Sequence, residues 1–499
     1  MIGNRCIVTL LLSAALMPTT VQGQSLFDQY RQQKQKQFDD YKARKQKEFD
    51  EYRRRKNEEF AEYMRQRWPE FEEEAPIEKP KEDKDVPPVV LPKEDRDKPI
   101  ETKPVPIEEV VAPPPAPKPQ PEPVAPIEEK PQPQVQYVQF TFYGTPCKVR
   151  FSDKERFRLS GCTNEAVAEA WKRLSGEAYD NMLYDCLELR KTLRLSDWAY
   201  LNMLSVFSET CLGKTNEARV LMGFIYCQSG YKMRFGITGD RLCVLYASDH
   251  IIFDRTYFDV DNEKFYVFGE GARQLAICDV SFPKEQSLSL WINRSQLFGY
   301  TGSSKRVLQS ERYPDMRVEV SMNKNLIDFY NSYPVSIVGD NFMTKWAMYA
   351  NAEVDKWVET ELYPQLEQKI KGLSELEAAE RLLNWVQTAF VYEYDDKVWG
   401  YDRAFFAEET LYYPYCDCED RSILFSHLMR DLLDLDVVLV YYPGHLATAV
   451  CFSEDVAGDY LWVDNLRFVV CDPTFINATV GMTMTGMDNK GAKAILLKN

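Results

Sequence analysis

The chain has 499 residues, of which 44% are hydrophobic and 28% are charged, and its net charge at neutral pH is −16. This length is enough for two or three domains. The acidic balance excludes nucleic acid as an expected partner, because phosphate backbones attract basic surfaces. We expect no metal ion and no cofactor, because the chain has only three histidines and a single residue separates Cys416 from Cys418.

Residues 1–23 have the pattern of a secretory signal peptide. Arg5 precedes an apolar run over residues 7–17, and Val21-Gln22-Gly23 offers a cleavage site with small residues. The run is too short to span a bilayer. We therefore expect an exported protein, in the periplasm, on the cell surface or outside the cell. Removal of the peptide takes Cys6 from the twelve cysteines, which leaves an odd number and so at least one free thiol.

Residues 24–75 carry aromatic residues at a period of eleven, and most of the positions between them are charged or polar. Eleven residues make slightly more than three helical turns, so the rings would form one stripe along an amphipathic helix. Two interpretations stay open: a solvated spacer, or self-association or contact with the cell envelope through residues 25–75. The repeated rings are Phe27, Phe38, Phe49, Phe60 and Phe71, with Tyr30, Tyr41, Tyr52 and Tyr63.

Residues 76–135 are rich in Pro, Glu, Lys and Val and contain no aromatic residue. Such a composition buries too little apolar surface to fold alone, so we predict a disordered linker here. Residues 136–335 then have the pattern of an α+β domain. Tyr137–Phe142 alternates like a strand, helical periodicity runs from Thr163 to about Cys227, and strand-like alternation continues to about Trp291.

Residues 336–499 contain the sequence that carries the chemistry. Ser374 with Glu377 forms a capping box that opens a helix. Paired apolar positions after Cys418 predict a second, buried helix that begins near this cysteine. At a helix start, unpaired backbone N–H groups and the positive end of the dipole favour a thiolate over a thiol.

Two polar residues follow Cys418 on predicted strands. Leu435–Tyr442 is a buried strand, Pro443-Gly444 is a turn, and His445 opens the next strand. A third strand ends near Asp472, because Pro473 cannot extend the ladder. A thiol at a helix start, an imidazole and a carboxylate on neighbouring strands form a Cys-His-Asp arrangement of the kind used in nucleophilic catalysis.

The segment Asp417–Ser422, with His445 and Cys471–Thr474, resembles the transglutaminase-like cysteine enzymes of the bacterial branch. The resemblance covers about residues 375–481. It implies a papain-like α+β core in which the helix carrying the cysteine packs on an antiparallel sheet. It also implies Cys418 as nucleophile, His445 as base and Asp472 as the residue that orients it. One position departs from the family, which has Gly two residues before its cysteine where this chain has Cys416.

The expected activity is that of a cysteine enzyme acting on amide bonds of a peptide or protein substrate through a thioester. Hydrolysis is favoured over transamidation because an exported protein works in water. The alternative is a non-catalytic, envelope-associated binding or structural protein built on the same scaffold. Residues 136–335 are a possible degenerate copy of the core, with Thr215 in the place of Cys418 and with His250 in a structural role.

Overall fold

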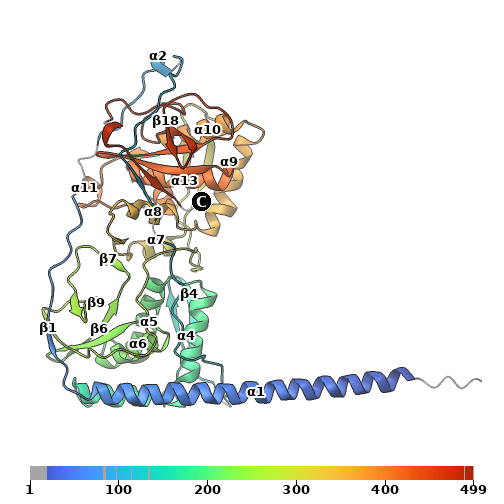
Figure 1. Ribbon diagram of the computed structural model, residues 1–499, viewed down its shortest axis with the longest axis vertical. Coiled ribbons are helices and arrows are strands. Elements are labelled where there is room, and N and C mark those ends of the chain that lie inside the picture. Colours follow the sequence, from blue (N-terminus) through green and yellow to red (C-terminus); the bar gives the residue numbers. More distant parts are fainter. Residues whose placement is uncertain are drawn as a thin grey trace, which may run out of the picture. The chain divides into compact units, whose positions relative to one another are not determined.

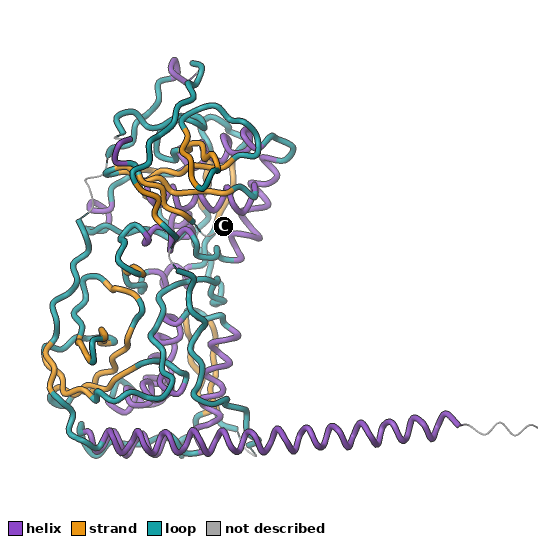
Figure 2. The backbone as a smooth tube through the Cα atoms, in the orientation of Figure 1, coloured by secondary structure: helices purple, strands orange, loops and turns teal. Residues whose placement is uncertain are grey.

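The computed structural model describes residues 19–81, 86–96, 98–113, 115–132, 135–487 and 489–497. Most of the predicted signal peptide, residues 1–18, lies outside the described residues. The fold is α+β, as the sequence predicts (Figures 1 and 2). It contains two six-stranded sheets, which are formed by different strands of the chain. The chain divides into two units between Arg55 and Lys56. Among the described residues, no helix is both long enough and apolar enough to cross a membrane.

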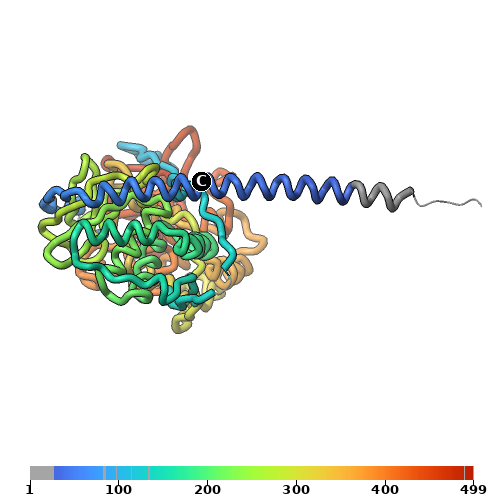
Figure 3. Tube along the Cα trace, turned by 90° about the horizontal axis from the view of Figure 1, so that it is seen from below, coloured from blue at the N-terminus to red at the C-terminus, as the bar shows by residue number. Residues whose placement is uncertain are grey.

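Helix α1 (Thr19–Met64) is continuous, as Figure 3 shows. In the part of this helix that belongs to the first unit of the chain, Phe27 and Phe38 are 64% and 61% exposed. The sequence predicted a helix that continues to residue 75, whereas α1 ends at Met64. Pro69 prevents the helix from continuing, because it has no N–H to donate and disfavours helical backbone at the residue before it. Phe71, the last ring of the repeat, lies in strand β1 (Glu70–Glu72).

The second unit begins with the last turns of α1. The Phe60 ring is buried there, with its centroid 5.0 Å from that of Trp171. The first sheet has the order β1-β10-β5-β6-β9-β8, and α6 packs on β5 and β6. Its strands are β5 (Met233–Thr238), β6 (Arg241–Ala247), β8 (Phe258–Val260), β9 (Glu263–Val267) and β10 (Gln274–Ile277).

The helices beside this sheet begin where the sequence supplies capping residues. Ser196 and Thr215 each accept a hydrogen bond from a backbone N–H of the first helical turn, which satisfies one of the free donors there. A hairpin, β3 (Tyr137–Phe142) and β4 (Thr145–Arg150), completes this part of the chain. The helical elements are α3 (Asn164–Leu174), η1 (Glu177–Tyr179), α4 (Asp180–Thr192), α5 (Asp197–Leu212) and α6 (Asn216–Gln228).

The second sheet has the order β18-β19-β17-β16-β20-β2, with α13 (Cys418–Leu433) packed on β16 and β17. Its inward side chains form a core that includes Val440, Ala449 and Phe468. The strands are β2 (Glu109–Val111), β16 (Asp436–Tyr442), β17 (His445–Cys451), β18 (Tyr460–Val463), β19 (Leu466–Cys471) and β20 (Lys493–Leu496); the one-turn helix η3 (Asn489–Gly491) precedes β20.

The two sheets share one connectivity. In each sheet a helix leads into a first hairpin (β5–β6 or β16–β17). A second hairpin then pairs with the second strand of this hairpin, and a later strand (β10 or β20) pairs with its first strand. The second hairpins turn on Asp261-Asn262 and Asp464-Asn465, all at positive φ, as a two-residue hairpin turn requires. All these pairings are antiparallel in both sheets. Only the outermost strands differ, because β1 is antiparallel to β10 and β2 is parallel to β20.

Smaller elements connect the sheets across the expected domain boundary at residues 335/336. Strand β13 pairs with β7, and the indole N–H of Trp385 on α10 donates to Leu308 O on β11 at 3.3 Å. The elements are β7 (His250–Ile252), β11 (Arg306–Gln309), β12 (Arg317–Val320), α7 (Lys324–Tyr330), β13 (Ser336–Val338), α8 (Thr344–Ala350), the π-helix η2 (Val358–Leu362), α9 (Tyr363–Ile370), α10 (Glu375–Ala389), β14 (Val391–Tyr392), α11 (Asp395–Val398), α12 (Ala407–Tyr412) and β15 (Tyr415–Cys416).

The described parts of residues 76–135 differ from the disordered linker that their composition predicts. This segment includes α2 (Lys93–Arg96) and supplies β2, in which Val110 pairs with Ala494. Val105 and Val111 are buried, at 4% and 2% exposure. Extended, proline-rich backbone suits a sheet edge, because an edge strand needs hydrogen bonds on one side only. The valines between the prolines then fill the margin of a core formed by other residues.

One prediction concerns Glu408 on α12. Its buried carboxylate accepts a hydrogen bond from Asp355 N at 2.5 Å, and burial raises its pKa from 4.5 to about 7. The folded state therefore holds a proton that the unfolded state releases, so this group's contribution to stability is full below pH 4.5 and is lost as the pH rises through 7. Glu408→Gln should reduce the fall in unfolding free energy between pH 5 and 7.5 by about 2 kcal/mol.

Urea unfolding at the two pH values measures this difference. The exposed Glu311→Gln is the matched control and should leave the pH dependence unchanged. An equal slope in Glu408→Gln and the parent protein would contradict the assignment.

Candidate active site

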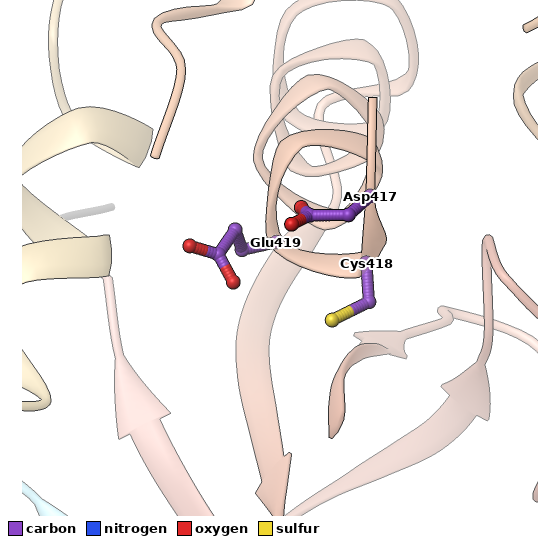
Figure 4. A group of neighbouring side chains, drawn as sticks. All are labelled: Asp417, Cys418 and Glu419. Carbon is purple, nitrogen blue, oxygen red and sulfur yellow. The ribbon is translucent and has the colours of Figure 1, made fainter. Parts of the chain in front are cut away.

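The site begins at the first turn of α13. As the sequence predicts, the helix starts at Cys418, directly after the N-cap Asp417. The backbone N–H of Asp417 donates to Asp420 Oδ2 at 3.2 Å, and Phe405 N donates to Asp420 Oδ1 at 2.9 Å. Asp420 thus joins the helix start to the loop before α12. Figure 4 shows Asp417, Cys418 and Glu419 at this end of the helix.

His445 and Asp472 meet on the neighbouring sheet. His445 opens β17 and Asp472 directly follows β19, and the register Thr448 to Cys471 sets them side by side. His445 Nε2 lies 2.9 Å from Asp472 Oδ2. The other carboxylate oxygen accepts from Thr474 N at 2.8 Å and Phe475 N at 3.1 Å, so the carboxylate is fixed from both sides. Within the described part of the chain, His445 Nδ1 has no hydrogen-bond partner.

A hydrogen bond from α13 to β17 sets the helix against the histidine. Ser422 Oγ donates to Leu446 O at 2.9 Å, directly after His445. Ser422 is four residues after Cys418, so both lie on one face of α13, one turn apart. The helix start therefore faces the start of β17. All three predicted residues are almost fully buried, with exposed fractions of 3% for Cys418, 2% for His445 and 1% for Asp472.

Cys416 lies in a different environment from Cys418. It belongs to β15, which pairs with β14, and its sulfur accepts a hydrogen bond from Arg421 Nε at 3.5 Å. Burial raises the pKa of the Cys416 thiol, and the Arg421 charge opposes this shift. Its strand and its contact with Arg421 set Cys416 apart from the helix start that carries Cys418.

Arg421 joins the pieces around the site. Its guanidinium donates to Gln387 O at 3.0 Å and Phe390 O at 2.9 Å, at the end of α10, and its contact with Pro473 O is longer, at 3.5 Å. Gln387 in turn donates from Nε2 to Asp472 O at 3.0 Å. The first turn of α13, the end of α10 and the turn that holds Asp472 are therefore linked by hydrogen bonds without exposure to water.

Acidic groups gather around the cysteine, and Asp395 joins those of the segment that carries Cys418 from a separate element of the chain. One terminal atom each of Asp417, Cys418 and Glu419 lies within 4.8 Å of the others, and Asp395, Asp417 and Asp420 form a second such group. Burial, with the nearby Asp395 charge, raises the pKa of Asp420 well above its usual value. An ionised carboxylate beside a thiol opposes the negative charge of a thiolate, so ionisation of these acids acts against the field of the helix start.

The first sheet presents the same positions with other residues. In the second sheet His445 precedes Thr448 by three residues, and Asp472 directly follows its partner Cys471. In the first sheet the corresponding pair is Val244 and Phe268, in which Phe268 N donates to Val244 O at 2.9 Å. Arg241 precedes Val244 by three residues and so has the place of His445. Gly269 directly follows Phe268 and so has the place of Asp472. Asn216 opens α6 as Cys418 opens α13.

The side chain of Asn216 confirms that α6 faces the start of β6. It donates to Asp240 O at 2.8 Å and accepts from Leu242 N at 3.0 Å, on either side of Arg241. The predicted register, with Thr215 in the place of Cys418, is wrong by one residue. Thr215 is the helix cap and corresponds to Asp417.

A sequence signal for this correspondence was overlooked. Val260-Asp261-Asn262, with Phe265 and Val267, recurs as Val463-Asp464-Asn465, with Phe468 and Val470 at the same spacing. His250 lies elsewhere, at the start of β7, within 3.3 Å of Ser336 Oγ and 3.4 Å of Ser289 Oγ. Burial lowers its pKa to about 4, so it is neutral at pH 7.

Comparisons of the chain with protein-family models, with curated proteins and with solved structures found no match.

Arg421 gives a stability prediction. Arg421→Met should lower the free energy of unfolding by about 3 kcal/mol or more, because the buried carbonyls of Gln387 and Phe390 lose their donor. Urea unfolding followed by circular dichroism measures the change. Arg158→Met, at an exposed arginine, is the control and should change it little. A loss below 1 kcal/mol for Arg421→Met would contradict the linking role.

Glu419 gives a prediction about reactivity. Glu419→Gln removes a carboxylate within 4.8 Å of the Cys418 sulfur, so iodoacetamide should modify Cys418 faster at pH 7. A rise of about tenfold corresponds to one pKa unit. Mass spectrometry of the Cys418 peptide measures the rate, and Glu311→Gln serves as control. An unchanged or slower rate in Glu419→Gln would show that this carboxylate does not oppose the thiolate.

Proposed function

We propose that this protein is an exported cysteine enzyme that cleaves amide bonds of peptides or proteins through Cys418, His445 and Asp472. The observation that carries the proposal is the buried pair of His445 Nε2 and Asp472 Oδ2, 2.9 Å apart, on strands that face the start of α13. Asp472 engages one ring nitrogen, and the other is left for a reacting group. This is the division of roles that a nucleophile, base and orienting carboxylate require.

The chemistry follows from these roles. His445 Nδ1 takes the proton from Cys418 Sγ, and the thiolate attacks the carbonyl carbon of the substrate amide. The imidazolium returns the proton to the amine nitrogen as the C–N bond breaks, leaving a thioester. A water molecule, deprotonated by His445, then attacks the thioester and releases the acid and the free thiol. The backbone N–H of Cys418, at the helix start, is the candidate donor to the oxyanion.

The architecture supports the transglutaminase-like, papain-like assignment. A helix that begins with the cysteine packs on an antiparallel arrangement of β16 and β17, and Cys, His and Asp follow in the chain order of that family. Hydrolysis is favoured over transfer to an amine, because no feature of the described residues selects an amine acceptor and an exported enzyme is surrounded by water.

The second candidate is a scaffold that binds peptide without catalysis. The near-complete burial of Cys418 and His445 favours it, because a substrate can reach them only if neighbouring groups move. Reactivity of the thiol separates the two functions.

We expect iodoacetamide at neutral pH to modify Cys418 faster than Cys416 in the folded protein. His445→Ala should slow the modification of Cys418, because no base takes the thiol proton, and Cys416→Ser should not. The half-buried Cys451 is an internal reference thiol. If Cys418 reacts no faster than Cys416 and His445→Ala has no effect, the catalytic proposal fails and the binding scaffold is supported.

Asp472→Asn tests the orienting role. The Asn oxygen can still accept from Thr474 N and Phe475 N, so the fold should persist. Its NH₂ would then face His445 Nε2 and force the proton onto Nδ1, where it cannot accept the thiol proton. Turnover of a peptide substrate should fall by orders of magnitude, about 10⁴-fold for the comparable change in a serine protease. Unchanged turnover would contradict the role.

A further inference from the structure

A cavity occupies the place in the first sheet that corresponds to the Cys418 site. Its volume is about 150 Å³, and it lies between α5, the start of α6, the strand β6 and the segment that directly follows β9. Arg241, in the position of His445, and Gly269, in the position of Asp472, both line it. A Cβ atom on Gly269 would meet no atom within 4 Å, so the missing side chain contributes to the open space.

The lining of this cavity is basic in an acidic chain. Lys214, Arg219 and Arg241 line it together with only two acids, Glu209 and Glu270, whereas the whole chain has a net charge of −16. Arg241 is held in place, because its guanidinium donates to Glu270 O at 2.9 Å and Gly271 O at 2.6 Å. These two acceptors are neutral carbonyls, so they hold the guanidinium without cancelling its charge.

One carboxylate already lies beside this guanidinium. Glu270 Oε2 is 3.4 Å from Arg241 Nη1, but the Glu270 side chain is 85% exposed. Exposed ion pairs of this kind contribute little free energy, so an incoming carboxylate can replace it at small cost. The rest of the lining combines the apolar Met222, Val244 and Phe268 with the hydroxyl side chains of Ser205 and Thr215. The cavity therefore fits a carboxylate on a short aliphatic arm.

We propose that the cavity formed by α6, β6 and Gly269 binds a carboxylate of an acidic peptide, with Arg241 and Arg219 as its cationic partners. The source is an Asp or Glu side chain or the peptide's terminal carboxylate. A site on this scaffold that has lost the thiol, imidazole and carboxylate can hold a peptide group without reacting with it. The inference depends on the cavity and on the repeated sheet, and it does not depend on catalysis by Cys418.

The test uses the Cys418→Ser protein, in which no turnover through this thiol can interfere. Three peptides are titrated by calorimetry: acetyl-Ala-Glu-Ala-amide, acetyl-Ala-Ala-Ala with a free terminal carboxylate, and the neutral acetyl-Ala-Gln-Ala-amide. At least one acidic peptide should bind about tenfold or more tightly than the neutral one, because charge-assisted hydrogen bonds to arginine are lost with the charge. The tighter of the two acidic peptides identifies the source of the carboxylate.

Variants locate the binding. Arg241→Gln and Arg219→Gln should each weaken the acidic peptide about tenfold, and Arg273→Gln, at an exposed arginine outside the cavity, should not. Melting temperatures of the unliganded variants show that each remains folded, and Arg219→Gln carries the test if Arg241→Gln does not fold. The proposal is overturned if the neutral peptide binds as tightly as both acidic ones, if no peptide binds, or if folded arginine variants bind like the parent.

Discussion

The buried guanidinium of Arg421 is the interaction on which the arrangement of the candidate site depends. It reaches carbonyls at the end of α10 and in the turn after Asp472 from the first turn of α13. A planar group with five donors can satisfy several carbonyls at fixed angles, which a lysine cannot do. The cysteine helix and the carboxylate turn are therefore held relative to each other by one side chain, and Gln387 adds a second link.

Two sheets with one connectivity carry different chemistry at equivalent positions. The second sheet, together with α13, holds a thiol, an imidazole and a carboxylate, which suit a proton relay. The first sheet, together with α6, holds an amide, a guanidinium and a glycine, which suit binding of an anion. The helix start and the first strand of the site are joined by hydrogen bonds in both sheets, through Ser422 in one and Asn216 in the other. A repeated scaffold thus conserves the place of a site while its side chains decide what the site can do.

Local signals in the sequence predicted much of the fold. The start of α13 at Cys418, the strands that begin at His445 and end before Asp472, and the capping box at Ser374 were all read from capping residues, turns and periodicity. The two cysteines have different surroundings although they are only two positions apart. The sulfur of Cys416 contacts Arg421, and the backbone turn at Asp417 separates it from Cys418.

Properties that depend on distant residues were not predicted. The valines of residues 76–135 pair with a strand several hundred residues away in the sequence. Because this pairing cannot be seen in the segment's own composition, the composition indicated disorder. One of the acids near Cys418 comes from the separate short helix α11, and sequence spacing gives no sign that Asp395 lies beside Asp417. The repeated Val-Asp-Asn pattern was present in the sequence, but a single aligned helix start gave a register one residue out of step.

The pairing of β2 with β20 affects how the protein is made. Lys493 lies opposite Glu109, so this strand pair closes a long loop in the chain, and β20 is synthesised after every other strand of its sheet. Until it emerges, the open edge of β16 has no partner on that side, and unpaired edges are where strands of different molecules join. Contacts so distant in sequence also form slowly. In the interval between synthesis of β16 and the docking of β20 and β2, this chain is therefore exposed to aggregation through that edge.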